Sequence, residues 1–272
     1  MRIRYGFDME IEVPVQTTLL TAFDVLPYRR GAIEYESPLV VTEPYTSEIY
    51  LDLFGNSCRR IITPAGRVSL QMEGIIADSG MPDPIPPNDF DLSTATLPLE
   101  TLPFLLASRY CETDLLSSFA WSNFGHIVGG AAKVQAICNY VHNHLTFSYP
   151  LARPTRTASE AYQERLGVCR DFAHLSITLC RCLNIPARYC NGYLGDIGVP
   201  RDPSPMDFNA WFEAYLGDGQ GGGLWYIFDA RHNMPRIGRI PVARGRDATD
   251  LPMLFTFGPH LLTRFSVITE EI

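Results

Sequence analysis

The sequence predicts an α+β protein in which helices pack on an antiparallel sheet and a β-sandwich domain precedes them. Three observations predict this. Apolar residues alternate with period two from 2 to about 76, helical spacing dominates from 102 to 183, and strand patterns return from 187 to 230. Helices followed by antiparallel strands are typical of the α+β class. At 272 residues the chain can form one large domain or two ordinary ones.

The first 77 residues carry short apolar alternations separated by turn residues. Turn chemistry is supplied by Phe54-Gly55-Asn56 and by Thr63-Pro64-Ala65-Gly66. We therefore expect a small antiparallel domain of the sandwich type over 1–77. The alternating positions are Ile3, Tyr5 and Phe7, then Ile49, Leu51 and Leu53, then Val68, Leu70 and Met72.

A proline-rich stretch follows, and it predicts a linker over 78–98. The stretch reads DSGMPDPIPPNDFDLSTATLP. Each proline fixes φ and removes a backbone donor, so regular structure is not expected there. A second domain then covers 99–272.

Helical spacing marks several segments of the second domain. Leu102 to Leu106 and Leu115 to Phe119 suggest two short helices, and Val134 to Leu145 a longer one. Thr157-Ala158-Ser159-Glu160 has the form of a capping box, which predicts a helix after it. The last helix begins near Cys169 and ends at Asn184-Ile185-Pro186. Its apolar face consists of Phe172, Leu175, Leu179 and Leu183.

Three strands are expected after this helix, over 187–194, 208–216 and 224–230. The last two are separated by GDGQGGG (217–223), so they are expected to form a hairpin. The glycine run lacks the Lys-Ser/Thr ending of a phosphate-binding loop, and a flexible hairpin loop explains it.

Composition and charge exclude several classes of protein. The chain is 46% hydrophobic and 19% charged, which is typical of a folded globular protein. A net charge of -8 disfavours nucleic acid as a partner. No signal-like segment and no apolar run of about eighteen residues occurs, so we expect a cytoplasmic protein without a membrane partner. Seven cysteines without a CxxC pair favour reduced thiols.

Cys169 is the candidate nucleophile. The start of a helix favours a thiolate through its unpaired amides and the positive end of its dipole. A cysteine nucleophile also needs a base, usually a histidine oriented by a carboxylate or an amide. Such partners commonly come from distant parts of the chain.

Four sequence segments resemble the bacterial branch of the transglutaminase-like superfamily, whose members are described as candidate cysteine proteases. The first is GVCRDFAHLSITLCRCLNIPARYCNGY (167–193). FNAWFEAY (208–215) and WYIFD (225–229) stand where that family has a His-Ala-Trp strand and a strand ending in aspartate. RIGRIPVARGRDATD (236–250) and the β-rich N-terminal region are also similar, so the resemblance spans nearly the whole chain.

The resemblance implies a papain/transglutaminase-like core and a catalytic triad. Cys169 would attack an amide or ester carbonyl, residue 209 would be the base and later the acid, and Asp229 would orient it. The implied substrate is a peptide, a protein or a small amide, whose acyl group passes to water or an amine. No cofactor and no metal is implied.

This chain departs from the family pattern at the base, because Asn209 occupies the expected histidine position. An amide side chain cannot take and return a proton near neutral pH, so activity is expected to be impaired. Three explanations remain open: an engineered replacement of histidine, a natural inactive relative that binds peptides, and another base. For the third, His232 is the nearest candidate in the sequence, but the chain would have to fold back toward the thiol after the strand that ends at Asp229.

Other polar residues are more simply explained as structural or solvated. Gln163 is a possible oxyanion donor, but an exposed helix residue explains it better. His142 and His144 lack the further ligands of a metal site, and His174 lies off the thiol's face of the helix. Trp211 and Trp225 are expected to be packing residues. Arg236, Arg239, Arg244 and Arg246 are expected on a solvated surface with local salt bridges.

Overall fold

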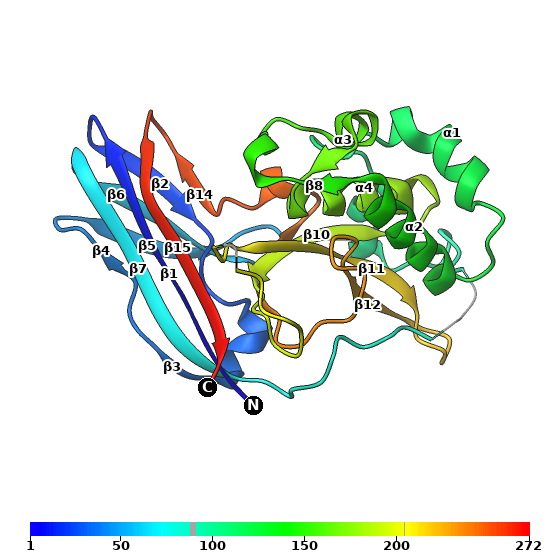
Figure 1. The fold of residues 1–272 in the computed structure, drawn as a ribbon, viewed down its shortest axis with the longest axis horizontal. Coiled ribbons are helices and arrows are strands. Elements are labelled where there is room, and N and C mark those ends of the chain that lie inside the picture. The colour runs from blue at the N-terminus through cyan, green and yellow to red at the C-terminus, as the bar shows by residue number, and fades with distance from the viewer. Residues whose placement is uncertain (88–90, 204) are drawn as a thin grey trace.

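The computed structural model describes residues 1–87, 91–203 and 205–272, arranged as a β-sandwich beside a sheet covered by helices (Figure 1). The helices and antiparallel strands confirm the predicted α+β class. Among the described residues, no helix is long and apolar enough to cross a membrane.

The sandwich consists of two antiparallel sheets, and strands from both ends of the chain contribute to it. One sheet has the order β15-β1-β7-β3, with β4 also on β7, and the other has the order β14-β2-β6-β5. The bounds in the first sheet are β1 (Arg2–Val13), β3 (Ile33–Glu36), β4 (Val40–Val41), β7 (Gly66–Ala77) and β15 (Leu261–Glu271). In the second they are β2 (Thr17–Thr21), β5 (Thr46–Leu51), β6 (Ser57–Thr63) and β14 (Leu254–Thr256).

The predicted alternation in β1 and β7 places one face of each strand in the sandwich core. Ile3 and Tyr5 of β1 are fully buried, as are Val68 and Leu70 of β7. Tyr5 pairs with Gly74, and a Cβ at Gly74 would lie only 2.6 Å from the Tyr5 ring. The glycine therefore makes room for an aromatic core residue.

A third antiparallel sheet, with the order β12-β11-β10-β13, supports the helices. Gly217 of β11 pairs with Gly223 of β12, which confirms the predicted hairpin around the glycine-rich loop. The strands are β10 (Ala187–Tyr193), β11 (Asn209–Gly217), β12 (Gly223–Phe228) and β13 (Ile240–Gly245).

Helix α4 lies at the centre of this unit, between the sheet and the other helices. It packs on β10 and β11 and also contacts α1, α2 and α3 (Figure 1). The predicted capping box is present at the start of α3, where Glu160 and Thr157 bond to each other's backbone amides. The helices are α1 (Thr113–Phe124), α2 (Gly130–His144), α3 (Ala158–Glu164) and α4 (Cys169–Cys182).

Shorter elements connect these parts. A parallel pair joins β8 (Thr146–Phe147) to β9 (Leu166–Gly167), directly before α4. The first of the two short helices expected after the linker is a 3₁₀ turn. The 3₁₀ helices are η1 (Pro27–Ala32), η2 (Leu99–Leu105), η3 (Tyr149–Leu151) and η4 (Ala248–Asp250).

The expected assignment of all of 99–272 to the second domain needs correction at its C-terminal end. β14 pairs with β2, and β15 pairs with β1 from Ile3↔Glu271 onward, so residues 254–271 lie in the sandwich. The physical reason is that β1 lies between β7 and β15, and without β15 it would present an unpaired edge. Tyr193 and Ile240 of the other sheet also pack in the sandwich core.

The predicted linker is irregular where the structure describes it, and residues 88–90 of it lie outside the described residues. It contacts the second unit through a bridge between Pro82 and Ile237. Asp83 also accepts hydrogen bonds from the backbone of Arg236 and from the Arg239 side chain. This part of the linker is therefore anchored to the segment after β12. The boundary between domains at 78–98 stays a prediction.

Candidate active site

Cys169 is the first residue of α4, as the sequence predicts, and only 8% of its surface is exposed. The backbone N–H of Val168 donates to Asp171 Oδ2 at 2.9 Å. Gly167 makes this turn possible, because a Cβ there would lie 2.6 Å from Asp171 Cβ. Asp171 thus fixes the residue before the thiol at the positive end of the helix dipole.

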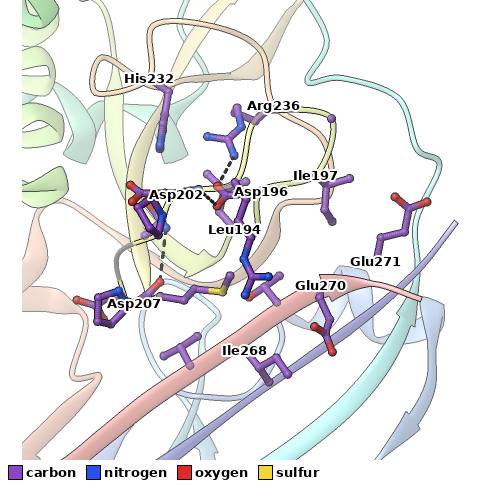
Figure 2. Close-up of a pocket in the computed structure, with 18 of the residues that line it drawn as sticks. Leu194, Asp196, Ile197, Asp202, Asp207, His232, Arg236, Ile268, Glu270 and Glu271 are labelled. Carbon is purple, nitrogen blue, oxygen red and sulfur yellow. Dashed lines mark hydrogen bonds and ion pairs between the residues drawn. The ribbon is translucent and has the colours of Figure 1, made fainter.

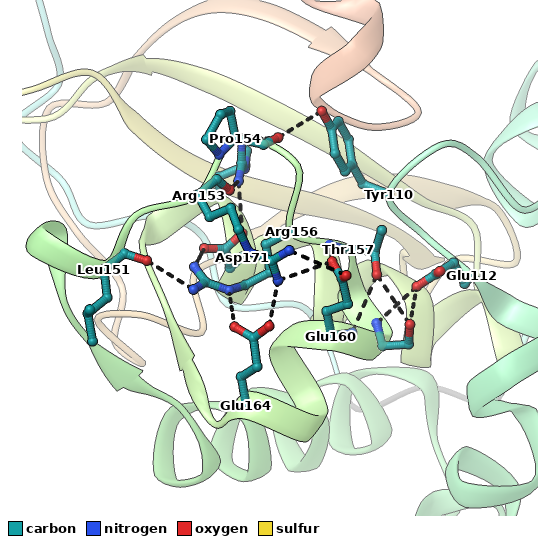
Figure 3. Close-up of polar contacts among 12 residues, drawn as sticks. Tyr110, Glu112, Leu151, Arg153, Pro154, Arg156, Thr157, Glu160, Glu164 and Asp171 are labelled. Carbon is teal, nitrogen blue, oxygen red and sulfur yellow. Dashed lines mark hydrogen bonds and ion pairs between the residues drawn. The ribbon is translucent and has the colours of Figure 1, made fainter.

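A buried ion-pair network holds Asp171 in turn (Figure 3). Arg156 donates to Asp171 Oδ2 at 3.2 Å, to Glu164 Oε2 at 2.9 Å and to the Leu151 carbonyl oxygen at 2.9 Å. The Asp171 side chain is fully buried, and that of Arg156 is 4% exposed. The start of α4 is therefore joined to α3 and to the loop before it.

Asn209 begins β11 and lies in the same groove as Cys169. The groove has a volume of about 350 Å³, and Tyr149, Asp207 and Asn191 also line it. Asn209 Oδ1 accepts a hydrogen bond from Arg231 Nη1 at 3.0 Å, and its Nδ2 donates to the Asp207 carbonyl oxygen at 3.5 Å. The amide of Asn209 is thus oriented by two neighbours that the sequence reasoning did not identify.

Asp229 follows directly after β12 and is buried. Its Oδ2 accepts hydrogen bonds from Arg239 Nη2 at 2.9 Å and from His232 Nδ1 at 2.8 Å. Its Oδ1 accepts from the His232 backbone amide at 3.1 Å. Burial opposes ionisation, but Arg239 and His232 outweigh it and hold the pKa of Asp229 well below its usual range. This carboxyl group therefore remains charged.

The thiol of Cys169 is protonated at neutral pH. Burial raises the pKa of Cys169 to about 11. The positive charge of Arg231 and a hydrogen bond with the Ala210 backbone act in the opposite direction, and the charges of Asp207 and Asp229 reinforce the rise. The effect of burial on the pKa of Cys169 is larger than that of Arg231. Position 209 is asparagine, so no imidazolium there favours the thiolate.

After β12 the chain turns back on itself, and this turn brings His232 to Asp229. The Asn233 amide donates to the Asp229 carbonyl oxygen at 2.7 Å, and this turn brings the His232 ring against the Asp229 carboxylate. His232 lines a cavity of about 650 Å³ together with Asn209 and Arg231 (Figure 2). Tyr149, Asp207 and Asn209 line both this cavity and the groove of Cys169.

The remaining histidines and Gln163 have other surroundings. Gln163 is exposed on α3, as expected for a solvated helix residue. His174 is fully buried and stacks on Tyr110, with its Nε2 accepting from the Ala248 amide. His142 Nδ1 contacts the carbonyl oxygens of Ala230 and Arg231 at 3.1 and 3.0 Å, so it supports the turn after β12. Within the described ranges no cluster of three or more His, Cys, Asp or Glu residues could hold a metal.

The expectation of a solvated arginine cluster is wrong for two of its four members. Arg236 and Arg239 are 4% and 6% exposed. They are buried because carboxylates face them: Arg239 contacts Asp83 and Asp229, and Arg236 lies 3.5 Å from Asp196. Arg244 and Arg246 are partly exposed, and Arg246 pairs with Asp250.

The tryptophans and cysteines agree with the predictions. Trp211 is 1% exposed, and the Arg239 guanidinium lies over its ring at 4.9 Å. Trp225 packs edge-on against Phe104 and under the Arg188 guanidinium. All seven cysteines are free and buried.

Arg231 is the residue of the site that sequence reasoning missed most clearly. In the β11–β12 hairpin Phe212 pairs with Phe228, and the same register places residue 231 opposite residue 209. Counting back from the glycine-rich turn would have identified this neighbour. Its guanidinium also lies over the Phe147 ring at 3.9 Å.

Comparison with known proteins identifies relatives of this chain. The sequence profile of the transglutaminase-like superfamily matches residues 127–230. A crystal structure from Cytophaga hutchinsonii, described as a candidate cysteine protease, is similar with a TM-score of 0.83 at 31% identity. That alignment covers 99% of this chain and 90% of the Cytophaga chain.

Two mycobacterial relatives are described as uncharacterized proteins. A protein of Mycobacterium leprae is 31% identical over 116 residues, which are 41% of this chain and 39% of the relative. A protein of Mycobacterium tuberculosis is 24% identical over 221 residues, covering 75% of this chain and 69% of the relative.

Proposed function

Because this chain belongs to the transglutaminase-like superfamily, we propose that it is a cysteine-dependent hydrolase or acyl transferase for an amide bond. The substrate is a peptide, a protein or a small amide, and Cys169 forms an acyl-enzyme with it. The observation that carries this proposal is the shared groove of Cys169 and Asn209. Asp229 stands at the end of the strand beside β11.

The reaction has two steps. In the first, the Cys169 sulfur forms a bond to the amide carbonyl carbon, the carbon–nitrogen bond breaks, and the leaving amine receives a proton. In the second, water or another amine attacks the thioester and the carbon–sulfur bond breaks. The thiol must lose a proton before it attacks, and the leaving and attacking groups must exchange protons with a base.

Asn209 weakens the first step. The side chain of asparagine can orient the acyl group or a water, but it cannot remove the thiol proton. General acid–base catalysis contributes about 10²–10⁴-fold in typical enzymes. The chain is therefore an impaired acyl transferase, and histidine at position 209 should be the most effective single repair.

The direct test compares the wild-type protein with Asn209→His on a panel of peptide amides, measuring both hydrolysis and transfer to an added amine. We expect histidine to increase Cys169-dependent turnover by about 10²-fold or more, the low end of general-base catalysis. The measurement is product release by mass spectrometry, with Cys169→Ala as the blank.

The control is the same replacement outside the groove, Asn143→His, on the exposed face of α2. It should leave turnover unchanged. If neither the wild-type protein nor Asn209→His turns over a substrate or becomes acylated on Cys169, the enzyme proposal fails. Binding of peptides without acylation would then support a peptide-binding module that has lost its activity.

A further inference from the structure

We propose that His232 is the acid–base residue for the step in which the acyl group leaves Cys169. This inference rests on the proposed function, because it needs an acyl-enzyme on Cys169. It assigns the proton transfer to a residue that the family pattern does not place in the triad.

The first argument is the orientation of the imidazole. His232 Nδ1 lies 2.8 Å from Asp229 Oδ2, and because a carboxylate only accepts, Nδ1 carries the hydrogen. The neutral ring then has its lone pair on Nε2. The backbone amide of His232 donates to the other carboxylate oxygen at 3.1 Å. A base whose tautomer is fixed by a buried carboxylate is the arrangement that nucleophilic enzymes use.

The second argument concerns the partner of Asp229. The hydrogen bonds of the Asp229 side chain to described residues come from His232 and Arg239, whereas Asn209 bonds to Arg231 and to the Asp207 backbone. In the family pattern this carboxylate orients the residue at position 209. In this chain Asp229 therefore orients His232 instead. The side chain of His232 is 22% exposed, so it is accessible to a small reactant.

The third argument is the space in front of the ring. Figure 2 shows His232 projecting into the cavity of about 650 Å³. Three residues, Tyr149, Asp207 and Asn209, form walls of both this cavity and the groove that contains Cys169. The two hollows therefore lie on either side of a shared wall that includes Asn209. A water or amine can approach a thioester on Cys169 from the side where His232 lies.

The proton balance of the step is simple. Water attacks the thioester carbonyl, its oxygen–carbon bond forms, and one water proton passes to Nε2 of His232. The tetrahedral intermediate then collapses and the carbon–sulfur bond breaks. The proton returns from Nε2 to the leaving sulfur, which regenerates the thiol and the neutral imidazole. An amine acceptor would follow the same path.

The test uses p-nitrophenyl acetate, whose leaving group needs no proton. The burst of nitrophenolate measures acylation of Cys169, and the steady-state rate measures removal of the acetyl group. His232→Asn keeps a side-chain N–H for Asp229 but has no basic nitrogen, whereas His232→Ala loses both. We expect both variants to keep the burst and to lose about 10²-fold or more of the steady-state rate. A merely structural role would leave His232→Asn near the wild-type rate.

Two controls separate loss of the base from loss of the fold. His260→Asn changes an exposed histidine that bonds to Thr256, far along the chain in the sandwich, and should keep the wild-type rate. Millimolar imidazole should restore the steady-state rate of His232→Ala but not that of Cys169→Ala, because the cavity has room for the free ring.

The outcomes distinguish the two proposals. If the burst depends on Cys169 and His232→Asn changes the steady-state rate by less than about threefold, the role of His232 is overturned. The proposed function would still stand. The absence of any Cys169-dependent burst, in the wild-type protein and in Asn209→His alike, would overturn both.

Discussion

At the scale of single residues, the thiol of Cys169 decides how the protein reacts. Its pKa is raised to about 11 by burial, so only a small fraction is thiolate at neutral pH. We expect alkylation of Cys169 by iodoacetamide to accelerate about tenfold per pH unit through pH 9 and to level off near pH 11, because the thiolate is the reacting form. Peptide mapping by mass spectrometry identifies Cys169 among the seven cysteines.

Arg231 provides the matched comparison for this profile. Its positive charge lowers the pKa of Cys169, so Arg231→Gln should move the profile to higher pH and slow alkylation at pH 8. Arg201→Gln removes an exposed guanidinium from the adjoining cavity and should have little effect. An alkylation rate that no longer increases above pH 7 would contradict a protonated thiol. It would indicate a thiolate paired with a cation.

Sequence reasoning located Cys169 and Asp229 at element ends because local patterns indicate where a helix begins and a strand ends. It could not locate the partners of these residues. The fold-back that joins His232 to Asp229 depends on a turn closed by Asn233, which adopts a positive φ of 52°. A pattern of apolar residues does not contain that information. The roles of Cys169, Asn209 and Asp229 stay predictions.

At the scale of elements, the segment after β12 and the described part of the linker are joined by Arg239. Its side chain is 3% exposed and contacts Asp83 and Asp229 at 2.8 and 2.9 Å. Arg239→Met keeps the apolar stem over Trp211 but leaves two buried carboxylates without this cation. We expect the free energy of unfolding to fall by about 3–5 kcal/mol, as measured by urea denaturation.

The matched control is Arg246→Met. Arg246 is 43% exposed beside Asp250, and a pair so close to solvent contributes less than about 1 kcal/mol. The pH dependence gives a further check. Asp229 has a lowered pKa, so its stabilisation is present above the pKa of the unfolded chain and is lost as the pH falls. The loss in free energy of unfolding caused by Arg239→Met should therefore become smaller in acid. A loss equal to that of Arg246→Met would contradict a stabilising buried ion pair.

The sequence predicted most helices and the central hairpin because their patterns are local. It missed β15 as a strand, and the reason is visible in the structure. Only Val267 and Thr269 of β15 are buried, so the strand has little apolar alternation of its own. Its partner β1 lies at the other end of the chain, and no local pattern records that pairing.

At the scale of the whole molecule, β15 joins the sandwich to the unit that carries the candidate site. It pairs with β1 on one side, and its residues Val267 to Glu271 line the cavity beside His232 (Figure 2). The loop after β10 approaches β15 closely at Gly195, where an added Cβ would lie 2.2 Å from the Thr269 carbonyl oxygen. Close packing at this joint therefore requires glycine.

Gly195→Ala should force β15 and the loop apart. Overpacking of this kind costs about 1–3 kcal/mol, and we expect that loss in urea denaturation. Because the same loop and strand both line the cavity, Cys169-dependent turnover of Asn209→His should fall in the double variant. Gly31→Ala is the control, since nothing lies within 4 Å of an added Cβ there. Equal stability of the two variants would show that β15 moves without cost, and the sandwich would then be no fixed wall of the site.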